Sequence, residues 1–169
     1  MYLFTFMDIL LQELTAGIPD GRELEVIIIR LAAAALLGMA IGIERQRAGK
    51  AAGIRTHMLV TVGTAAFVLA VLHHGMTSDG LSRVIQGIIT GIGFIGAGTI
   101  IKLDSAMDVK GLTTSAGIWI SAAIGVTIGM GLLGLAIMVT LLTLVILAVT
   151  VTVDNRINKG RLMHKGNKH

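Results

Sequence analysis

The densest group of side chains that could do chemistry lies between positions 44 and 57. It consists of Glu44, Arg45, Lys50, Arg55, Thr56 and His57. A membrane enzyme with an interfacial site around Glu44 and His57 is one interpretation, but too few polar groups converge there to support it. As a simple alternative, the basic residues anchor the chain to anionic lipid headgroups, with about 1 kcal/mol available per residue.

Glu44 adds nothing to such an anchor, so the cluster also fits a specific structural or functional site. Glu44 would then pair with Arg45 or Arg55, or accept hydrogen bonds from the amides that begin the next apolar segment. Thr56 is the expected N-cap of that segment. Lipid anchoring and a specific site both stay open.

His73 and His74 suggest a metal ligand pair or a pH sensor. Adjacent residues point about 100° apart on a helix, which favours two ordinary interfacial histidines. Arg30 lies about one turn inside an apolar segment, where a charge indicates a functional site. Because it is near the end of that segment, snorkelling to the interface is the less costly explanation.

No metal, cofactor or catalytic site is readable elsewhere. Magnesium prefers carboxylate and water oxygens, and no apolar segment has an Asp or Glu in its interior. Ser115 and Ser121 have no histidine and acid at a recognisable spacing. One connection mixes acids and lysines evenly, as solvated loops do: Lys102, Asp104, Asp108 and Lys110.

Residues Gly91 to Gly98 read Gly-Ile-Gly-Phe-Ile-Gly-Ala-Gly, which contains the dinucleotide-binding pattern G-x-G-x-x-G. That fingerprint needs a preceding strand, a following helix and an acid about 20 residues later. Here no charge occurs from Val84 to Ile101. The segment therefore indicates a membrane helix, and no cofactor is expected.

Composition agrees with a membrane protein. The 169 residues are 54% hydrophobic and 14% charged, with a mean hydropathy of +0.84. Soluble domains carry about 25% charged residues. The absence of cysteine excludes disulfides and cysteine metal sites. The pI of 9.9 could suggest nucleic acid, but the basic residues flank membrane segments, so no nucleic acid is expected.

The predicted fold is an all-α integral membrane bundle of about five helices. An interfacial segment, 1–25, with a short apolar helix rather than a signal peptide, precedes a transmembrane domain, 26–153, and a basic tail, 154–169. The expected spans are about 26–43, 59–75, 84–101, 112–129 and 132–153. Basic residues gather in the first connection and the tail, which predicts an outer N-terminus and a cytoplasmic C-terminus.

Small residues recur at helical spacing in three of the spans. Close packing across such residues drives helix association in lipid. This predicts a bundle of the first, third and fourth spans, with the third central and the second and fifth outside. A hinge or a path is the functional alternative. The predicted packing positions are Gly38, Gly42, Gly87, Gly91, Gly93, Gly96, Gly98, Gly117, Ser121 and Gly125.

Three blocks of sequence resemble the MgtC/SapB family of bacterial inner-membrane proteins. The first runs from Leu37 through Glu44-Arg45 to His57, and the second is Gly91–Gly98. The third runs from Val109 to Gly125, with Gly111, Thr113 and Thr114 at a helix start where the threonines are expected caps.

The resemblance implies a multi-pass protein of the cytoplasmic membrane, linked to growth at low magnesium and to acid or ion stress. Some members are thought to restrain the membrane ATP synthase. Longer members carry a soluble domain after the last span, so a function that resides there is expected to be absent here or supplied by a partner.

We therefore expect a non-enzymatic regulator that contacts another membrane protein, for which the resemblance suggests ATP synthase, or that associates with itself. The alternative is a small oligomeric transporter or channel for Mg²⁺ or H⁺. Its polar path would be lined by Thr90, Thr99, Ser115 or Ser121.

Overall fold

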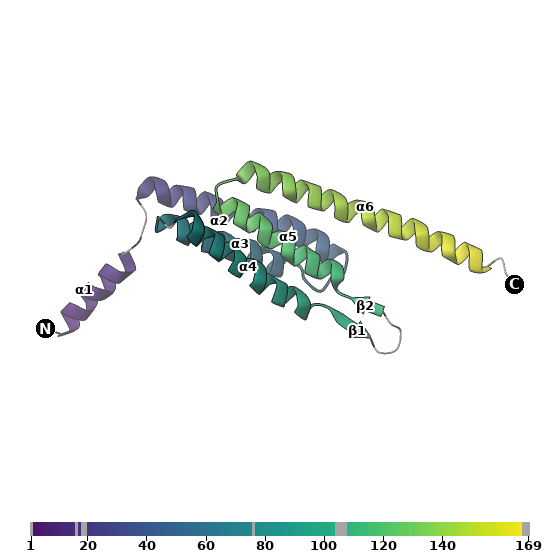
Figure 1. Ribbon diagram of the computed structural model, residues 1–169, viewed down its shortest axis with the longest axis horizontal. Coiled ribbons are helices and arrows are strands. Elements are labelled where there is room, and N and C mark those ends of the chain that lie inside the picture. The colour runs from purple at the N-terminus through teal and green to yellow at the C-terminus, as the bar shows by residue number, and fades with distance from the viewer. Residues whose placement is uncertain (1, 16, 18–19, 76, 104–107, 167–169) are drawn as a thin grey trace.

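The computed structural model describes residues 2–15, 17, 20–75, 77–103 and 108–166. Within these residues the chain forms helices joined by short turns and one small hairpin (Figure 1). The elements are α1 (Tyr2–Thr15), α2 (Gly21–Arg47), α3 (Ile54–His73), α4 (Ser78–Gly98), β1 (Ile101–Leu103), β2 (Asp108–Lys110), α5 (Leu112–Gly129) and α6 (Leu133–Gly166).

Five helices, α2 to α6, are long and apolar enough to cross a membrane, as the sequence predicts. The expected fourth span, 112–129, coincides with α5. α2 and α6 extend beyond the apolar stretches because polar end turns add to them, for instance Arg45 and Arg47 at the end of α2. α3 and α4 begin before the predicted spans but also end earlier, at His73 and Gly98, and Ile101 of the predicted third span belongs to β1. At the start of α2, the Asp20 side chain accepts a hydrogen bond from the Glu23 amide at 2.9 Å.

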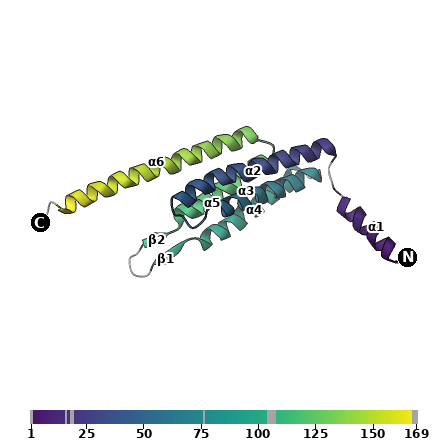
Figure 2. The same ribbon diagram turned by 180° about the vertical axis from the view of Figure 1, so that it is seen from behind.

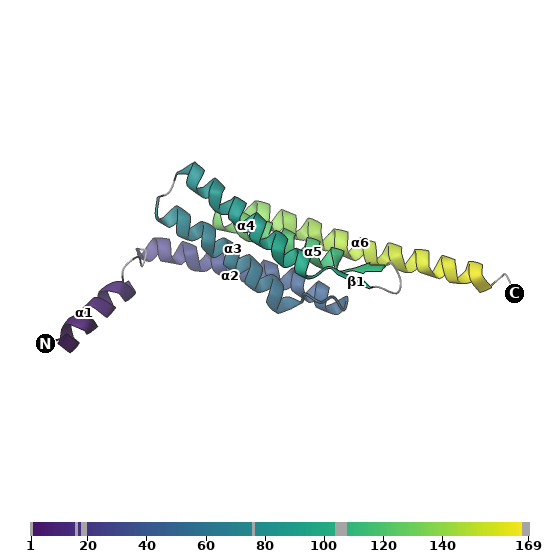
Figure 3. The ribbon, with the colours of Figure 1, turned by 60° about the horizontal axis from the view of Figure 1, so that its bottom comes forward.

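The order of packing differs from the prediction. In the most apolar 18-residue stretch of each helix, 56% of residues are buried in α5 and 39% in α3, against 11% in α4. α5 packs against α2, α3, α4 and α6, whereas α4 packs against α3 and α5 (Figure 3). The expectation that the third span is central and the second lies outside is therefore wrong. The fifth span, α6, is peripheral as expected, with 17% of its stretch buried.

The side chains of α4 explain this arrangement. Its bulky Ile88 and Ile92, with Gly96, face the bundle and are buried. A Cβ added to Gly96 would lie 2.5 Å from the Ser115 hydroxyl of α5. By contrast, a Cβ added at Gly87, Gly91, Gly93 or Gly98 would meet nothing within 4 Å. These four glycines do not pack within the described chain, contrary to the prediction.

Glycines of α2 and α5 instead bring the backbones of the inner helices together. A Cβ on Gly38 would lie 2.8 Å from the carbonyl oxygen of His57, and one on Gly42 would lie 2.5 Å from the Cα of Ile54. A Cβ on Gly125 would overlap the Thr64 hydroxyl and the carbonyl oxygen of Thr61. The helices α2, α3 and α5 therefore form a closely packed layer. Membrane helices associate in this way, because small residues let their backbones approach each other.

The connection between α4 and α5, for which the sequence predicts a solvated loop, contains a short hairpin, and Asp104 lies outside the described residues. β1 and β2 pair antiparallel, with Ile101 opposite Lys110 and Leu103 opposite Asp108. Gly111 follows with φ +96° and is the N-cap of α5. A side chain there would overlap the carbonyl oxygen of Thr99, so glycine is required for both space and conformation.

Three capping predictions are corrected. Thr113 and Thr114 lie within the first turn of α5, behind the Gly111 cap. Thr56 lies inside α3, whose N-cap is Gly53 without a side-chain hydrogen bond. Both helices begin earlier than their first threonine because a glycine already makes the turn into the helix.

Arg30 does not simply snorkel. Its guanidinium donates to the carbonyl oxygen of Gly129 at 3.0 Å, at the end of α5. The charge therefore stabilises the negative end of a neighbouring helix and one of its terminal carbonyls.

The two ends of the chain extend away from the bundle. Figures 1 and 2 show α1 set apart beside the start of α2, and α6 continuing past the hairpin. We call the end of the bundle with the α2–α3 turn and the hairpin the hairpin end, and the opposite end the Arg30 end. Residues 167–169 of the predicted basic tail lie outside the described residues.

Candidate functional site

The predicted cluster of residues 44–57 divides into an inward and an outward part. Glu44, Arg45 and His57 turn into the bundle at the hairpin end, where Arg45 and His57 are buried. Lys50 and Arg55 are exposed, which fits contact with lipid headgroups. Thr56 is partly exposed on the first turn of α3.

Arg45 forms a two-point ion pair with the neighbouring Glu44. Its Nε donates to Glu44 Oε2, and its Nη2 donates to Glu44 Oε1 at 2.7 Å. The Arg45 side chain is 2% exposed and the Glu44 side chain 23%. A buried guanidinium is costly without a carboxylate partner, so Glu44 makes the inward position of Arg45 possible.

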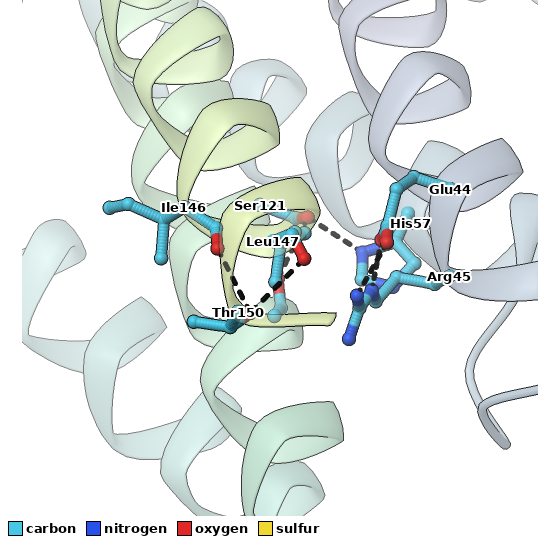
Figure 4. A network of polar contacts seen from close by, with 8 residues as sticks. Glu44, Arg45, His57, Ser121, Ile146, Leu147 and Thr150 are labelled. Atoms are coloured by element: carbon cyan, nitrogen blue, oxygen red, sulfur yellow. Dashed lines mark hydrogen bonds and ion pairs between the residues drawn. The ribbon is translucent and has the colours of Figure 1, made fainter. Parts of the chain in front are cut away.

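His57 lies beside this pair and contacts α5 (Figure 4). Its Nδ1 is 2.8 Å from the hydroxyl oxygen of Ser121, and that hydroxyl donates to the carbonyl oxygen of Gly117 at 3.0 Å. Either Nδ1 or the Ser121 hydroxyl donates in this contact, depending on the imidazole tautomer. Nε2 is buried and makes no hydrogen bond in the described part of the chain.

Gly117 provides the space for both side chains. A Cβ at this position would lie 3.3 Å from His57 Cε1 and 3.9 Å from Arg45 Cδ. The predicted packing positions Gly117 and Ser121 thus belong to the same site as residues 44–57. Sequence spacing alone could not reveal this, because the link is a tertiary contact between α3 and α5.

Further buried hydroxyl groups lie along α3, beyond His57. Thr61 Oγ1 lies 2.7 Å from the carbonyl oxygen of Ala34 on α2, and Thr64 Oγ1 donates to the carbonyl oxygen of Val60 at 2.8 Å. These threonines were missed by the sequence reasoning, since they appear as ordinary residues of an apolar segment. They satisfy backbone carbonyls where Gly38 and Gly125 allow close packing.

Ser121 and His57 alone do not make a catalytic triad, which also needs an acid that orients the imidazole. Glu44 is occupied by Arg45 and does not orient the imidazole. Among the described residues no three His, Cys, Asp or Glu side chains are grouped so that they could hold a metal ion.

At the Arg30 end, the two histidines have separate partners. His73 Nδ1 lies 2.8 Å from a carboxylate oxygen of Glu23, and His74 Nδ1 lies 2.9 Å from the carbonyl oxygen of Ala70. The rings meet edge to face, with centroids 5.5 Å apart. They therefore do not act as a joint ligand pair.

A second feature is an apolar groove between α3 and α4 with a volume of about 380 Å³. On the α4 side it is lined by Gly87 and Gly91, together with isoleucines and Val84, and on the α3 side by Thr64 and Phe67. We call this surface the α3/α4 groove.

Comparison with known proteins identifies the chain. The model of the MgtC family matches residues 31–156. The chain is 44% identical to the putative magnesium transporter YhiD of Escherichia coli K12 over 132 residues, which cover 72% of this chain and 59% of YhiD.

It is also 44% identical to protein SrpB of Synechococcus elongatus over 142 residues, 78% of each chain. It is 40% identical to protein MgtC of Salmonella typhimurium LT2 over 141 residues, which cover 83% of this chain and 59% of MgtC. The chain thus spans about three-fifths of the length of YhiD and MgtC. No solved structure matches it.

With five helices in its described part able to span a membrane and a family match over most of its length, this multi-pass membrane protein belongs to the MgtC family.

Proposed function

We propose that this chain is a non-enzymatic regulator in the bacterial cytoplasmic membrane, with its N-terminus outside. It acts in adaptation to magnesium limitation or to acid or ion stress through contact with another membrane protein. By family resemblance, the membrane ATP synthase is the first partner to examine. The observation that supports contact most is the exposed α3/α4 groove, where glycines let a foreign helix approach the α4 backbone.

The polar interior supports regulation over transport. A permeating cation needs free oxygen ligands, but the Glu44 carboxylate is engaged with Arg45 and the buried hydroxyls described above are engaged with backbone carbonyls. The residues suggested for a polar path also diverge. Thr90 is exposed on α4, while Ser121 is buried against His57.

The transporter alternative has one specific point in its favour, which is the name of the Escherichia coli relative, putative magnesium transporter. An oligomer could also bring symmetry-related groups together. We therefore design the test so that both functions give a positive signal.

Gly91→Leu fills the α3/α4 groove, and Gly134→Leu is the matched control on α6, since a Cβ at either glycine meets open space. In magnesium-starved cells, site-specific photo-crosslinking from the groove should capture an ATP synthase subunit. Inverted vesicles should show slower ATP hydrolysis when the protein is present. Gly91→Leu should abolish both effects, and Gly134→Leu should preserve them.

The same proteins are then reconstituted alone in proteoliposomes loaded with a Mg²⁺-sensitive or pH-sensitive dye. We expect fluxes equal to those of empty vesicles. Saturable flux of Mg²⁺ or H⁺, together with unchanged ATP hydrolysis, would contradict the regulatory function and support the transporter function.

A further inference from the structure

A cavity at the Arg30 end combines charges of both signs with an apolar wall. It lies between the first turns of α2 and the last turn of α3 and has a volume of about 350 Å³. Valine, isoleucine and leucine side chains of the two helices form its apolar wall. Its charged or titratable side chains are Asp20, Arg22, Glu23, Arg30 and His73. We call this cavity the α2/α3 pocket.

The pocket extends from the end of the bundle into the apolar part of α2. Arg22 lies on the first turn of α2, and Arg30 follows eight residues later, about 12 Å along the helix axis. Glu23 and Arg30 are seven residues apart and therefore share one face of the helix, with Val26 and Ile27 between them. The charged rim is thus at the depth of lipid headgroups, and the apolar wall is at the depth of the first acyl carbons.

The charged groups of the pocket keep hydrogen-bonding capacity that the bundle does not use. Glu23 Oε1 lies 2.8 Å from His73 Nδ1, and the second oxygen of that carboxylate makes no hydrogen bond among the described residues. Partly buried Arg30 donates from Nη1 to the carbonyl oxygen of Gly129, while its Nε and Nη2 make no hydrogen bond within the described part of the chain. Arg22 has no ion-pair partner there either. Donors and acceptors therefore both remain for a ligand.

We propose that the α2/α3 pocket binds a phospholipid with a phosphoethanolamine headgroup. The phosphate of this headgroup accepts hydrogen bonds from Arg22 and Arg30, which are permanently cationic. Its primary ammonium donates to the carboxylates of Asp20 and Glu23. One acyl chain lies along the apolar wall, so the pocket recognises the headgroup and the chain together. Basic pockets between membrane helices bind lipid headgroups in the same way.

Charge complementarity selects this headgroup over the other common ones. An anionic headgroup would satisfy the two arginines but would bring a phosphate next to two carboxylates that it cannot neutralise. A choline headgroup has a quaternary ammonium without an N–H to donate, and proteins hold such groups with aromatic side chains. No Trp, Tyr or Phe lines the pocket in the described part of the chain. The inference goes beyond the proposed function and does not rest on it.

Native mass spectrometry of the full chain in detergent measures the selectivity. The protein is titrated with phosphatidylethanolamine, phosphatidylcholine and phosphatidylglycerol that carry the same acyl chains. Phosphatidylethanolamine should bind more tightly than the other two by about 5- to 20-fold. Equal binding of the three lipids, or tighter binding of phosphatidylglycerol, would overturn the proposal. Soluble glycerophosphoethanolamine has no acyl chains and should not displace the lipid at equal concentration. Displacement would show that a lipid is not the specific occupant.

Variants with matched controls test the residues of the pocket. Glu23→Gln should remove most of the preference for phosphatidylethanolamine over phosphatidylcholine, and Arg22→Gln should weaken binding of all three lipids. Asp79→Asn and Arg83→Gln are the controls, because both side chains are exposed near the start of α4, at the same end but outside the pocket. They should leave binding unchanged. Unfolding midpoints verify that each variant folds. Equal effects of the pocket and control variants would contradict binding at this place.

Photolabelling locates the lipid independently of affinity. Phosphatidylethanolamine with a diazirine beside its headgroup is incorporated into vesicles that contain this protein alone. After illumination, peptides from the start of α2 and the end of α3 should carry the label. Label spread evenly over the ends of all the helices would contradict a site in the α2/α3 pocket. Both leaflets of the vesicle contain the lipid, so the result depends neither on the orientation of the chain nor on a regulated partner.

Discussion

Gly125 and Gly87 look alike in the sequence, each in a helix rich in small residues, but their surroundings differ. A Cβ at Gly125 would overlap the Thr64 hydroxyl and a backbone carbonyl of α3, whereas a Cβ at Gly87 would meet nothing within 4 Å. A hydroxyl can rotate away, but the backbone cannot. At the residue scale, the first glycine is therefore required by packing and the second is not.

Gly125→Ala should destabilise the folded bundle by about 1–3 kcal/mol, because it overpacks the α3–α5 contact. Gly87→Ala should be neutral or stabilising by up to about 1 kcal/mol, because alanine favours the helix. Unfolding in mixed detergent micelles, followed by the fluorescence of Trp119, compares the two. Equal losses of stability would contradict the difference in packing.

Ser121→Ala tests the buried polar contact. It leaves His57 Nδ1, together with Nε2, without a partner in the interior, which should cost about 1–3 kcal/mol. Thr127→Ala is the matched control, because Thr127 donates only to the carbonyl oxygen of Ile124 in its own helix. The same unfolding measurement should show a clearly smaller effect for the control; a Ser121→Ala protein as stable as the parent would remove the argument for this contact.

At the scale of elements, residues outside α5 fix both of its ends. Gly111 makes the turn into it from the hairpin, and Arg30 of α2 binds its last carbonyl. Few of its own side chains cap it, so its limits depend on tertiary contacts. α5 is central because α2, α3, α4 and α6 pack around it, and its last carbonyl group also depends on a neighbouring helix.

Arg30→Leu keeps the apolar stem but removes the hydrogen bond to Gly129, and it should destabilise the protein by about 1.5–3 kcal/mol. Arg22→Leu serves as control, since Arg22 is exposed on the first turn of the same helix. Hydrogen exchange at the last turn of α5 should rise for Arg30→Leu alone. A rise with both variants would indicate a general charge effect instead.

The number and approximate place of the spans follow from the sequence, because an apolar stretch of the right length has few alternatives. Their order of packing does not. Small residues on α4 and α5 give the same pattern, and only the partner surfaces decide which glycines are covered. The site shows the same limit. The Glu44–Arg45 pair was one of the open alternatives, whereas the link from His57 to Ser121 joins positions 64 residues apart and needs the fold.

At the scale of the whole molecule, the distribution of charge predicts how the bundle sits in the membrane. The hairpin end, with Lys50 and Arg55 exposed, is expected to face the cytoplasm, and the Arg30 end the outside. The turn between α3 and α4 and the turn between α2 and α3 lie at opposite ends of the bundle (Figure 1), and each has exposed residues.

Single cysteines in the cysteine-free chain measure this orientation. A membrane-impermeant maleimide should label Ser78→Cys in intact cells and Lys50→Cys only after the membrane is opened. The reverse order would place the N-terminus inside and overturn the assignment.

The alternation of hydrophobicity along the chain bears on how the protein is made. α2 and α6 are the most hydrophobic spans, and the less hydrophobic α3, α4 and α5 come between them. The middle spans also make polar contacts between helices: His57 of α3 contacts Ser121 of α5, and Thr61 of α3 contacts the carbonyl oxygen of Ala34 on α2. α2 and α6 are hydrophobic enough to partition into lipid independently. α3 and α5 enter the bilayer at a lower free-energy cost together, because the polar groups of His57 and Ser121 then contact each other. The central helices should then integrate into the bilayer as a group, which is completed once α6 has emerged from the ribosome.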